Sequence, residues 1–588
     1  MAPEADDLLR DYLLLKDEAA RQRELIDELT RPRHWTQEGP RGSQATAIHH
    51  ALDRMLERAV RVRNLVRPKR PDSPFEQTSP EGTRSESETD GFFIRMRQAA
   101  DLLGAHVSDA PALDTFTSAA ASSDRRLEQI AWLGLTATLG RYPSADELER
   151  AARAQREGGV RELGEVLRLA HLDAMSAKAT APHPLGIRTG AVIIDVTHTA
   201  RYDLHTGIQR VVREVASRWL EDSRSLLVWW DDKLGHLREL GFEETYRFRN
   251  WADFMPKEAD SKPSVRDFDD TPRSILVPWD STFLLPELAA DSDRSNAYCG
   301  LVLSGVVGRF GAIGFDLVPV AAAETVHQGM VGVFNRHVSV IKHAHRLSAI
   351  SESAANEFRS LCHALAAQGL AGPVVEPHLL PPTPFEVSDL ALASVRSSLG
   401  ETNLPVVLVV GSREPRKNQI AVLEATRHLW LAGHRFHLVM VGGSGWNSAA
   451  IDDEIDRLRT LGVDIVLRTR ATEIELFAWY RIARFSMFPS LYEGFGLPIA
   501  ESLHLGTPVI TSNYGAMSEI ASLGGALMVD PRDPGQVRDA MARLLSDDEL
   551  NAKLRAEAQA RVWPTWDGYA ADVWNHLVES STPAPSGE

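Results

Sequence analysis

The amino-acid sequence predicts an α/β protein in which two facing Rossmann-like domains follow a helical N-terminal region. At 588 residues the chain is too long for one ordinary domain. From residue 190 onward, short apolar runs alternate with helical patterns, which is typical of buried parallel strands with helices on both faces of the sheet. A Pro-rich segment at 377–384 divides this alternation into two series, so two such domains are expected.

The first part of the chain is predicted to be helical. Residues 1–66 are expected to form a helical N-terminal segment, because apolar residues recur there at near-helical spacing. Residues 67–91 are rich in Pro, Ser, Glu and Gly, and too few apolar residues remain to offset the entropy of ordering. A disordered linker is therefore expected at 67–91, followed by a helical accessory module over 92–180.

The N-terminal segment ends in a basic run that includes Arg61, Arg63 and Arg67. Such a run is either a solvated helix face that suits the helix dipole or a contact for an anionic membrane surface. For residues 1–180 as a whole, self-association, docking of a partner protein and peripheral membrane contact all stay open.

Each of the two later domains is predicted from its own set of apolar runs. In the first domain, residues 188–385, strands are expected at 191–194, 226–230, 275–277, 312–314 and 374–375. In the second domain, residues 386–562, they are expected at 406–410, 438–441, 465–467, 485–488, 509–510 and 527–529. Ligands are then expected at the carboxyl ends of the strands, between the two domains.

Composition excludes several classes of protein. The formal net charge of −17 disfavours nucleic-acid binding, which needs a basic surface. Two cysteines exclude a disulfide framework and a multi-cysteine zinc site. The N-terminus lacks a signal-peptide core and no stretch approaches the roughly 20 apolar residues of a membrane helix. A cytoplasmic location is therefore expected, with peripheral contact at the inner face of the plasma membrane as the open addition.

The first motif, VGSREPRKN at 410–418, directly follows an apolar run. Gly411 permits a sharp turn, and Arg413, Arg416 and Lys417 then lie where a strand ends and a helix begins. Phosphate oxygens suit this arrangement, since Arg binds them bidentately and Lys binds them as a point charge. A surface turn with solvated charges is the alternative that this segment alone leaves open.

The second motif, PSLYEGFGLPIAE at 489–501, also follows an apolar run. Gly494 and Gly496 let backbone N–H groups approach a ligand, and the helix that follows directs its positive end at the same place. Glu493 and Glu501 add two carboxylates, which suit sugar hydroxyls. A capped helix with acidic first-turn residues is the alternative; it explains Glu501 but not the glycines beside Glu493.

Together with VGGSGW at 441–446, GTPVI at 506–510 and the E-x7-E spacing of Glu493 and Glu501, these motifs resemble those of the large retaining GT-B glycosyltransferase family, which includes bacterial mannosyltransferases and sucrose synthases. The resemblance covers most of residues 190–575 and none of 1–180. It implies a GT-B fold.

The resemblance also assigns roles to the domains and to single residues. The first domain would be the acceptor side and the second the nucleotide-sugar side; residues 563–580, from Trp566, would form a helix that crosses back onto the first domain, before a disordered tail at 581–588. Arg416 and Lys417 would bind the donor diphosphate with help from Arg413, and the stretch 468–473 would lie near the base.

Glu493, with the backbone of Phe495 and Gly496, would hold the transferred sugar, and Glu501 would bind the ribose hydroxyls. The implied donor-binding residues are Gly207, Gly411, Arg413, Arg416, Lys417, Gly442, Gly494, Phe495, Gly496, Leu497 and Glu501. The implied catalytic residues are Glu493, Lys417, Arg416 and Asp316.

In the first domain, DVT at 195–197 followed by TGIQRVVRE at 206–214 resembles a subgroup found in bacterial surface-polysaccharide assembly. Gly207 opens a helix whose apolar face packs on the sheet and whose exposed start can meet donor phosphates or the acceptor. An ordinary turn with a packing glycine is the alternative. The apolar face is predicted to comprise Ile208, Val211, Val212, Val215 and Trp219.

One departure from the family pattern lies at Phe315-Asp316, since relatives often carry His or Tyr immediately before this Asp. Asp316 is a candidate for acceptor contact or proton handling, with a buried structural carboxylate as the alternative. The nearby His327, His337, His343 and His345 are left without a role, because a single histidine is more often structural.

No D-x-D motif stands at a strand end. The acidic pairs at 231–232, 269–270 and 452–453 are interpreted as solvated loop or helix-start residues. Protein cations at a phosphate site supply the charge that a metal would otherwise supply. The sequence therefore predicts metal independence, and no cofactor besides a nucleoside-diphosphate sugar as co-substrate.

The functional hypothesis is retaining transfer of a hexose to a glycan or lipid-linked acceptor in bacterial polysaccharide or glycoconjugate biosynthesis. Mannose from GDP-mannose is favoured, because G-x-x-E-P-R-K-N is frequent in mannosyltransferases; this is analogy. A catalytically silent GT-B scaffold is the alternative that Phe315 keeps open. A sugar-nucleotide epimerase is disfavoured by the E-x7-E segment and the Gly207 loop.

Overall fold

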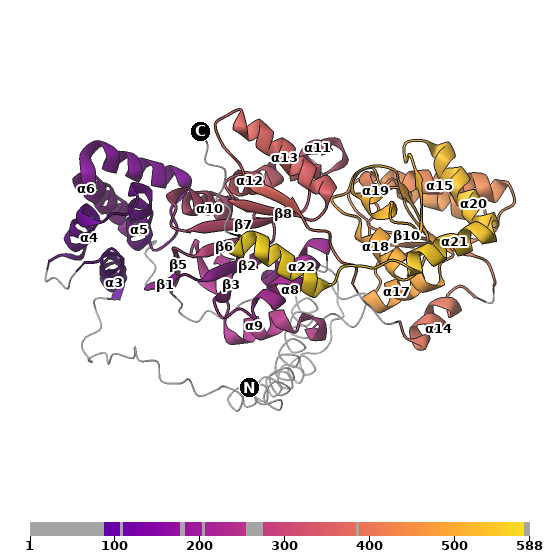
Figure 1. Cartoon of the computed structure of the whole chain (residues 1–588), viewed down its shortest axis with the longest axis horizontal. Coiled ribbons are helices and arrows are strands. Elements are labelled where there is room, and N and C mark those ends of the chain that lie inside the picture. The colour runs from indigo at the N-terminus through magenta and orange to yellow at the C-terminus, as the bar shows by residue number, and fades with distance from the viewer. Residues whose placement is uncertain are drawn as a thin grey trace, which may run out of the picture. The chain divides into compact units, whose positions relative to one another are not determined.

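The computed structural model describes residues 87–105, 110–176, 183–202, 206–254, 274–327, 329–383, 387–400 and 402–580 (Figure 1). The predicted N-terminal helical segment, the linker up to residue 86 and the C-terminal tail lie outside the described residues. The predicted end of the linker at residue 91 is wrong, because helix α3 (Ser87–Leu102) begins earlier. The first turn of α3 is polar, and its composition therefore resembles that of the preceding linker.

The chain divides into two compact units. The smaller unit comprises residues 1–86 and 241–255, of which the structure describes 241–254. These residues form helix α9 (Phe242–Arg249) and the 3-10 turn Trp251–Phe254, where the guanidinium of Arg247 lies 4.8 Å from the centre of the Phe254 ring. The larger unit, residues 87–240 and 256–588, contains all the features described below.

Helices α3, α4 (Ala112–Ser122), α5 (Leu127–Leu139) and α6 (Ala145–Ser176) occupy the range predicted to be a helical accessory module. Helix α5 is buried nearly all round, as expected of a helix that is apolar on every face. The module packs directly on the next domain: the Tyr142 hydroxyl donates to the Leu276 carbonyl at 2.6 Å, and Arg125 pairs with Asp280 at 2.8 Å.

The first Rossmann-like domain is built on a seven-stranded sheet of order β4-β3-β2-β6-β7-β8-β9. All neighbouring strands are parallel except β3 and β4. The strands are β2 (Val192–Asp195), β3 (Ser225–Asp231), β4 (His236–Glu239), β6 (Thr282–Leu285), β7 (Arg309–Gly314), β8 (Arg346–Ala349) and β9 (Val374–Pro377). The helices are α7 (Thr197–Arg201), α8 (Gly207–Trp219), α10 (Ser292–Ser304), α11 (Val318–Ala321), α12 (Met330–Ile341) and α13 (Glu352–Ala366).

The expectation that residues 275–277 belong to this sheet is wrong. They lie in β5 (Ile275–Trp279), which pairs with β1 (Leu185–Thr189) in a separate two-stranded sheet. The chain then turns at Asp280, whose φ of 49° is left-handed, and β6 takes the place in the main sheet. Two apolar runs separated by so short a turn resemble one strand in the sequence.

The second Rossmann-like domain contains an all-parallel sheet of order β12-β11-β10-β13-β14-β15. Every strand predicted for this domain is present: β10 (Val406–Val410), β11 (His437–Val441), β12 (Ile465–Arg468), β13 (Phe485–Phe488), β14 (Val509–Ser512) and β15 (Ala526–Val529). The helices are α14 (Asp389–Ser397), α15 (Gln419–Leu431), α16 (Ala449–Thr460), α17 (Glu473–Ile482), α18 (Leu497–His504), α19 (Gly515–Ala521), α20 (Pro534–Ser546) and α21 (Asp548–Gln559).

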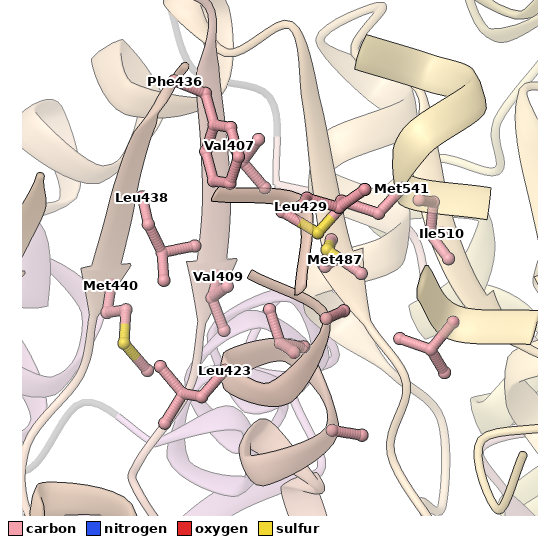
Figure 2. Close-up of a cluster of buried hydrophobic side chains, with 14 of the residues drawn as sticks. Val407, Val409, Leu423, Leu429, Phe436, Leu438, Met440, Met487, Ile510 and Met541 are labelled. Carbon is pink, nitrogen blue, oxygen red and sulfur yellow. The ribbon is translucent and has the colours of Figure 1, made fainter. Parts of the chain in front are cut away.

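The core of this domain explains why its strands are apolar at nearly every position. On one face of the sheet, Val407 and Val409 of β10 pack with α15 and α20 (Figure 2). On the other face, the alternate residue Leu408 packs with Phe477 and Trp479 of α17. Because helices cover both faces, neither side of the strand can be polar.

The C-terminal helix α22 (Trp566–Trp574) returns to the first domain, as the resemblance implies for residues 563–580. The Trp219 indole N–H of α8 donates to the Ala570 carbonyl at 2.9 Å, and Figure 1 shows α22 beside α8. Two Rossmann-like domains with such a returning helix form the GT-B fold. Within the described ranges, every helix is too short or too polar to cross a membrane.

Candidate active site

The two sequence motifs lie side by side because of the strand order. Strands β10 and β13 are neighbours, with Val407 opposite Phe485. Between them the order of the sheet reverses, since the strands following β10 in the chain are added on one side and those from β13 onward on the other. Such a switch point is where doubly wound sheets bind ligands. The loop after β10 carries VGSREPRKN, and the loop after β13 carries PSLYEGFGLP.

The loops after β10 and β11 each depend on one glycine. Gly411 has a φ of 133° and Gly442, in the loop after β11, has a φ of 148°. A Cβ atom on Gly442 would lie 2.1 Å from the carbonyl oxygen of Gly411. The two loops therefore touch through backbone atoms, which only glycine permits.

Arg413 holds these loops together. Its guanidinium donates to Asp452 Oδ1 at 2.7 Å, to the Gly442 carbonyl at 2.9 Å and to Ser444 Oγ at 2.6 Å. Its side chain is 5% exposed, so a bound phosphate would reach it only by replacing these contacts. Asp452, predicted to be a solvated helix-start acid, is at the start of α16 but serves as a partner of Arg413.

The structure brings Arg416, Lys417 and Glu493 together. Arg416 Nη1 lies 2.7 Å from Glu493 Oε2, and Lys417 Nζ lies 2.6 Å from Glu493 Oε1. Ser490 Oγ also donates to Glu493 Oε1 at 2.6 Å, and Glu414 accepts from Arg416 at 2.9 Å. One carboxylate thus fixes both cations, from a loop almost eighty residues further along the chain.

The charges of this group are set by its surroundings. Burial opposes the charge of Glu493, but Lys417 and Arg416 outweigh it and hold the pKa of that carboxyl below its ordinary value. Burial raises the pKa of Asp316 and of Glu414, against the opposing effect of the same cations. The site therefore contains one carboxyl whose pKa is lowered and two whose pKa values are raised relative to their ordinary values.

Asp316 lies at the same place, although it comes from the first domain. A Cβ atom on Gly494 would lie 2.4 Å from the Phe315 carbonyl oxygen and 3.0 Å from Asp316 Oδ2. Asp316 Oδ1 accepts the Val318 N–H at 3.0 Å, so this oxygen helps to shape the turn after β7. Phe315 is buried and has no titratable group, so the imidazole of relatives has no counterpart there.

Further contacts in this region were missed by sequence reasoning. Ser351 Oγ, at the start of α13, donates to the Gly494 carbonyl at 2.6 Å. The Tyr492 hydroxyl is hydrogen-bonded to Glu357 of α13, which with burial raises the pKa of Tyr492 beyond its ordinary range. The signal available in the sequence was weak, because serine, tyrosine and glutamate are common on loops and helices.

Helix α18 begins at this edge of the sheet. Gly496 has a φ of 110° and precedes Leu497, the first helical residue, while the Phe495 side chain is buried. The first turn of any helix has N–H groups without intrahelical partners, which suit an anion. A Cβ atom on Gly207 would lie 3.0 Å from Leu497 Cδ1, so the start of α8 faces the start of α18.

The start of α8 is itself held in place. Gln209 Oε1 accepts from the Thr206 N–H at 3.1 Å and from Thr206 Oγ at 2.7 Å, and its amide nitrogen contacts His198 Nδ1 at 2.9 Å. The predicted apolar face is confirmed at four of its five positions, where Val211, Val212, Val215 and Trp219 are buried; Ile208 is only partly buried.

A buried cluster of charged side chains lies next to helix α7 in the first domain. Arg294 donates to Asp195 at 2.6 Å and to Glu287 at 2.9 Å, and all three side chains are almost fully buried. Asp195 is the last residue of β2, and Glu287 lies two residues after the neighbouring strand β6, where the order of the first sheet reverses. Glu287 accepts the N–H groups of His198 and Thr199, which fixes α7.

Of the four histidines left without a role, two are structural. His337 is buried and accepts the Ala289 N–H at 3.2 Å, and burial lowers its pKa to about 3. His345 accepts the Phe310 N–H at 3.0 Å between neighbouring strands. Within the described ranges, no cluster of histidine, cysteine or carboxylate side chains could hold a metal ion. Metal independence stays a prediction.

Comparison with known proteins agrees with the position of these motifs. Residues 394–561 match the family model described as glycosyl transferases group 1. The chain is 26% identical over 457 residues to the serotype-specific mannosyltransferase WbdA of Escherichia coli, covering 73% of this chain and 49% of the relative. It is 31% identical over 177 residues to the O-antigen chain mannosyltransferase B of Escherichia coli, covering 29% and 44% respectively.

The chain spans about half the length of these curated relatives. A solved structure of Anabaena Alr3699/HepE in complex with UDP and glucose superposes with a TM-score of 0.43 at 12% identity, over 66% of this chain and 95% of that chain. The segment that matches the family model is the domain whose loops hold Arg416, Lys417 and Glu493.

Proposed function

We propose that this chain is a retaining glycosyltransferase that moves a hexose from a nucleoside-diphosphate sugar to a glycan or lipid-linked acceptor. The observation that carries the proposal is the convergence of Arg416 and Lys417 on Glu493 at the switch point between β10 and β13. The match of residues 394–561 to glycosyl transferases group 1 supports it.

The main catalytic task is to stabilise the departing diphosphate. Arg416 and Lys417 supply two cations, and the starts of α18 and α8 supply N–H groups and positive dipole ends. Glu493 and Glu414 hold Arg416 in one orientation before the donor arrives. Pre-oriented charges of this kind stabilise the transition state without reorganisation.

The carboxylates are proposed to handle the sugar and the acceptor. Glu493, ionised and held by two cations, accepts hydroxyl groups of the transferred hexose. Asp316, from the opposite domain and with a raised pKa, faces the same place and takes up the acceptor proton. The two groups thus approach the sugar from different domains.

Mannose from GDP-mannose is the favoured donor. The curated relatives at 26% and 31% identity are mannosyltransferases by name, and one of them is named an O-antigen chain mannosyltransferase. The similarity to these relatives is also the reason for proposing a role in bacterial polysaccharide or glycoconjugate biosynthesis.

Calorimetric titration with GDP, UDP and ADP, in buffer containing a chelator, tests the donor site. Tight binding of one nucleotide is expected, and Lys417→Ala should weaken it about tenfold to a hundredfold, because a charge-assisted contact of about 1.5–3 kcal/mol is lost. Lys553→Ala is the matched control, since this exposed lysine lies on α21 and pairs with Glu557 on the same helix. Transfer assays with the corresponding sugar nucleotide, read by the anomeric configuration of the product, test retention.

Binding of none of the three nucleotides would contradict the proposal and favour a GT-B scaffold without transferase activity. Nucleotide binding without transfer to any glycan acceptor would also favour the scaffold. The structural reason would then be the buried Phe315, which has no titratable group.

A further inference from the structure

Arg210 of α8 joins the two Rossmann-like domains through the buried carboxylate of Glu501 and the partly buried carboxylate of Glu473. Its Nη1 atom donates to Glu501 Oε1 at 2.8 Å and to Thr383 Oγ1 at 3.2 Å, and its Nη2 atom donates to Glu473. The exposed fractions of the side chains are 13% for Arg210, 6% for Glu501 and 18% for Glu473. Arg210 comes from the first domain, whereas both carboxylates come from α17 and α18 of the second.

This ion triad is not explained by packing alone. A buried carboxylate is costly unless it is paired and hydrogen-bonded, and two buried carboxylates close together are costlier still. The other partner of Glu501 is the Tyr480 hydroxyl, 3.1 Å from Oε2, which carries no charge because burial raises its pKa far above neutrality. Within the triad, Arg210 is therefore the cation that favours the charged form of Glu501 and fixes the orientation of its carboxylate.

The triad leaves Glu501 able to accept further hydrogen bonds. A carboxylate has about four acceptor sites, and Arg210 and Tyr480 occupy two of them. A ribose presents two adjacent hydroxyl donors. An ionised, oriented carboxylate matches that pair, whereas a protonated carboxyl does not, because it has lost acceptor sites and gained a donor.

We propose that Arg210 is a cross-domain positioning residue for the nucleoside of the donor: it holds Glu501 so that this carboxylate accepts the ribose hydroxyls, and the nucleoside subsite is complete only when α8 lies against the second domain. This inference rests on the proposed function. It assigns to α8 a role beyond the Gly207 turn, because the helix also supplies the countercharge of a carboxylate that lies almost three hundred residues later in the chain.

Arg210→Gln tests the proposal, with the nucleoside diphosphate that the protein binds and its 2′,3′-dideoxy analogue as probes. For the unmodified protein, the ribose form should bind at least tenfold more tightly than the dideoxy form at pH 7. For Arg210→Gln, this ratio should fall towards one, while the affinity for the dideoxy form changes little. Arg218→Gln is the matched control, since Arg218 lies on the same helix and pairs with Glu214 and Asp567 instead.

The pH dependence separates a positioning role from a merely structural one. Burial raises the pKa of Glu501 and Arg210 opposes this rise most strongly; the other titratable groups acting on Glu501 are Tyr480 and Glu473, both of α17. Without Arg210 the pKa rises further, so the affinity of Arg210→Gln for the ribose form should increase between pH 6 and pH 8.5. The unmodified protein should show a smaller change over the same range.

A second variant, Arg210→Lys, guards against a failure of Arg210→Gln to fold. It keeps the charge but cannot reach both carboxylates as a fork, so it should retain part of the ribose preference with little change in pH dependence. An unchanged ribose preference in both variants would overturn the proposal. Tighter binding of the ribose form by Arg210→Gln would also overturn it, because Arg210 would then compete with the nucleoside for Glu501. Absence of nucleotide binding by the unmodified protein would instead overturn the proposed function.

Discussion

Glu493 sets the positions of both cations in the candidate active site. Its two oxygens each take one cation, Arg416 or Lys417, at about the shortest distances that charged hydrogen bonds reach. Burial alone would raise the pKa of this carboxyl, and the opposite direction of its shift shows that the cations dominate. At the scale of single residues, the chemistry of the site is therefore decided by partners from other strands.

Gly442→Ala should destabilise the fold although Gly442 carries no side chain to lose. The added Cβ atom would lie 2.1 Å from the Gly411 carbonyl oxygen, at a φ of 148° that side chains rarely adopt. We expect a loss of about 2 kcal/mol or more in the free energy of unfolding, measured by chemical denaturation.

The neighbouring Gly443→Ala is the control for Gly442→Ala. Its Cβ atom would lie 3.5 Å from the Thr469 carbonyl oxygen, which is an ordinary contact distance. Equal stability of the two variants would show that the loops after β10 and β11 do not depend on their close backbone contact.

The buried His337 should make the fold sensitive to acid. Burial lowers its pKa to about 3, from an ordinary value of 6.5. Below pH 6.5 the unfolded chain binds a proton that the folded chain does not, so the free energy of unfolding falls as pH falls towards 3. The slope contributed by one such histidine is about 1.4 kcal/mol per pH unit.

His337→Gln should remove this contribution. Denaturation between pH 6.5 and pH 4 measures it: the variant should show a smaller pH slope than the unmodified protein, and the exposed His327→Gln should leave the slope unchanged. A slope that is the same in all three proteins would mean that other groups carry the acid sensitivity.

At the scale of elements, strand prediction succeeded where burial on two faces forced an apolar run. All six predicted strands of the second sheet are present, and β10 and β13 have the predicted bounds. Strands β1, β4, β6 and β8 of the first part of the chain were not predicted. Of these, β8 is fully buried but contains Arg346 and Ser348, and the Ser348 hydroxyl contacts His378 Nδ1 at 2.9 Å. A buried strand that satisfies its polar side chains by long-range contacts leaves no apolar run in the sequence.

Thr565 caps the returning helix α22. Its hydroxyl oxygen accepts the Gly568 N–H at 3.1 Å, and the helix places Trp566, Tyr569 and Val573 in the core. Thr565→Ala should lower the free energy of unfolding by about 1 kcal/mol, the ordinary contribution of such a cap. Thermal or chemical denaturation measures the effect. Thr565→Ser keeps the hydroxyl and should restore most of the stability; equal losses in both variants would rule out the capping role.

At the scale of the whole molecule, hydrogen bonds and ion pairs join the two Rossmann-like domains at several separate places. Besides the Arg210 triad and the Ser351–Gly494 contact, Glu519 of α19 accepts the N–H groups of Glu352 and Ser353 at the start of α13. The Trp446 indole N–H donates to the Thr325 carbonyl at 2.9 Å. These contacts fix Asp316 against the loop that carries Glu493.

Trp446→Phe should loosen the segment of the first domain that it contacts. Loss of one hydrogen bond, worth about 1 kcal/mol, should raise hydrogen exchange around residues 318–327 about fivefold, with β10 and β11 unchanged. Trp430→Phe is the control, because Trp430 packs with Phe436 and Arg435 inside the second domain. Unchanged exchange in Trp446→Phe would show that this bond does not hold the domains together.

The sequence by itself determined the two Rossmann-like domains, the strands of the second sheet, the apolar face of α8 and the two loops that carry Arg416, Lys417 and Glu493. These features depend on local sequence. Buried parallel strands must be apolar, and cations lie at the end of a strand when a glycine-rich turn that carries them follows that strand directly. The resemblance of the motifs added the GT-B fold and the returning helix.

Tertiary structure alone decided which charges meet. The pairing of Arg210 with Glu501, the use of Arg413 as a loop brace and the approach of Asp316 to Gly494 join residues that lie tens to hundreds of positions apart. Hydrophobic periodicity records which face of an element is buried, but it does not record which buried charge lies opposite. That depends on strand order and on the packing of one domain against the other, and a local pattern of residues contains neither.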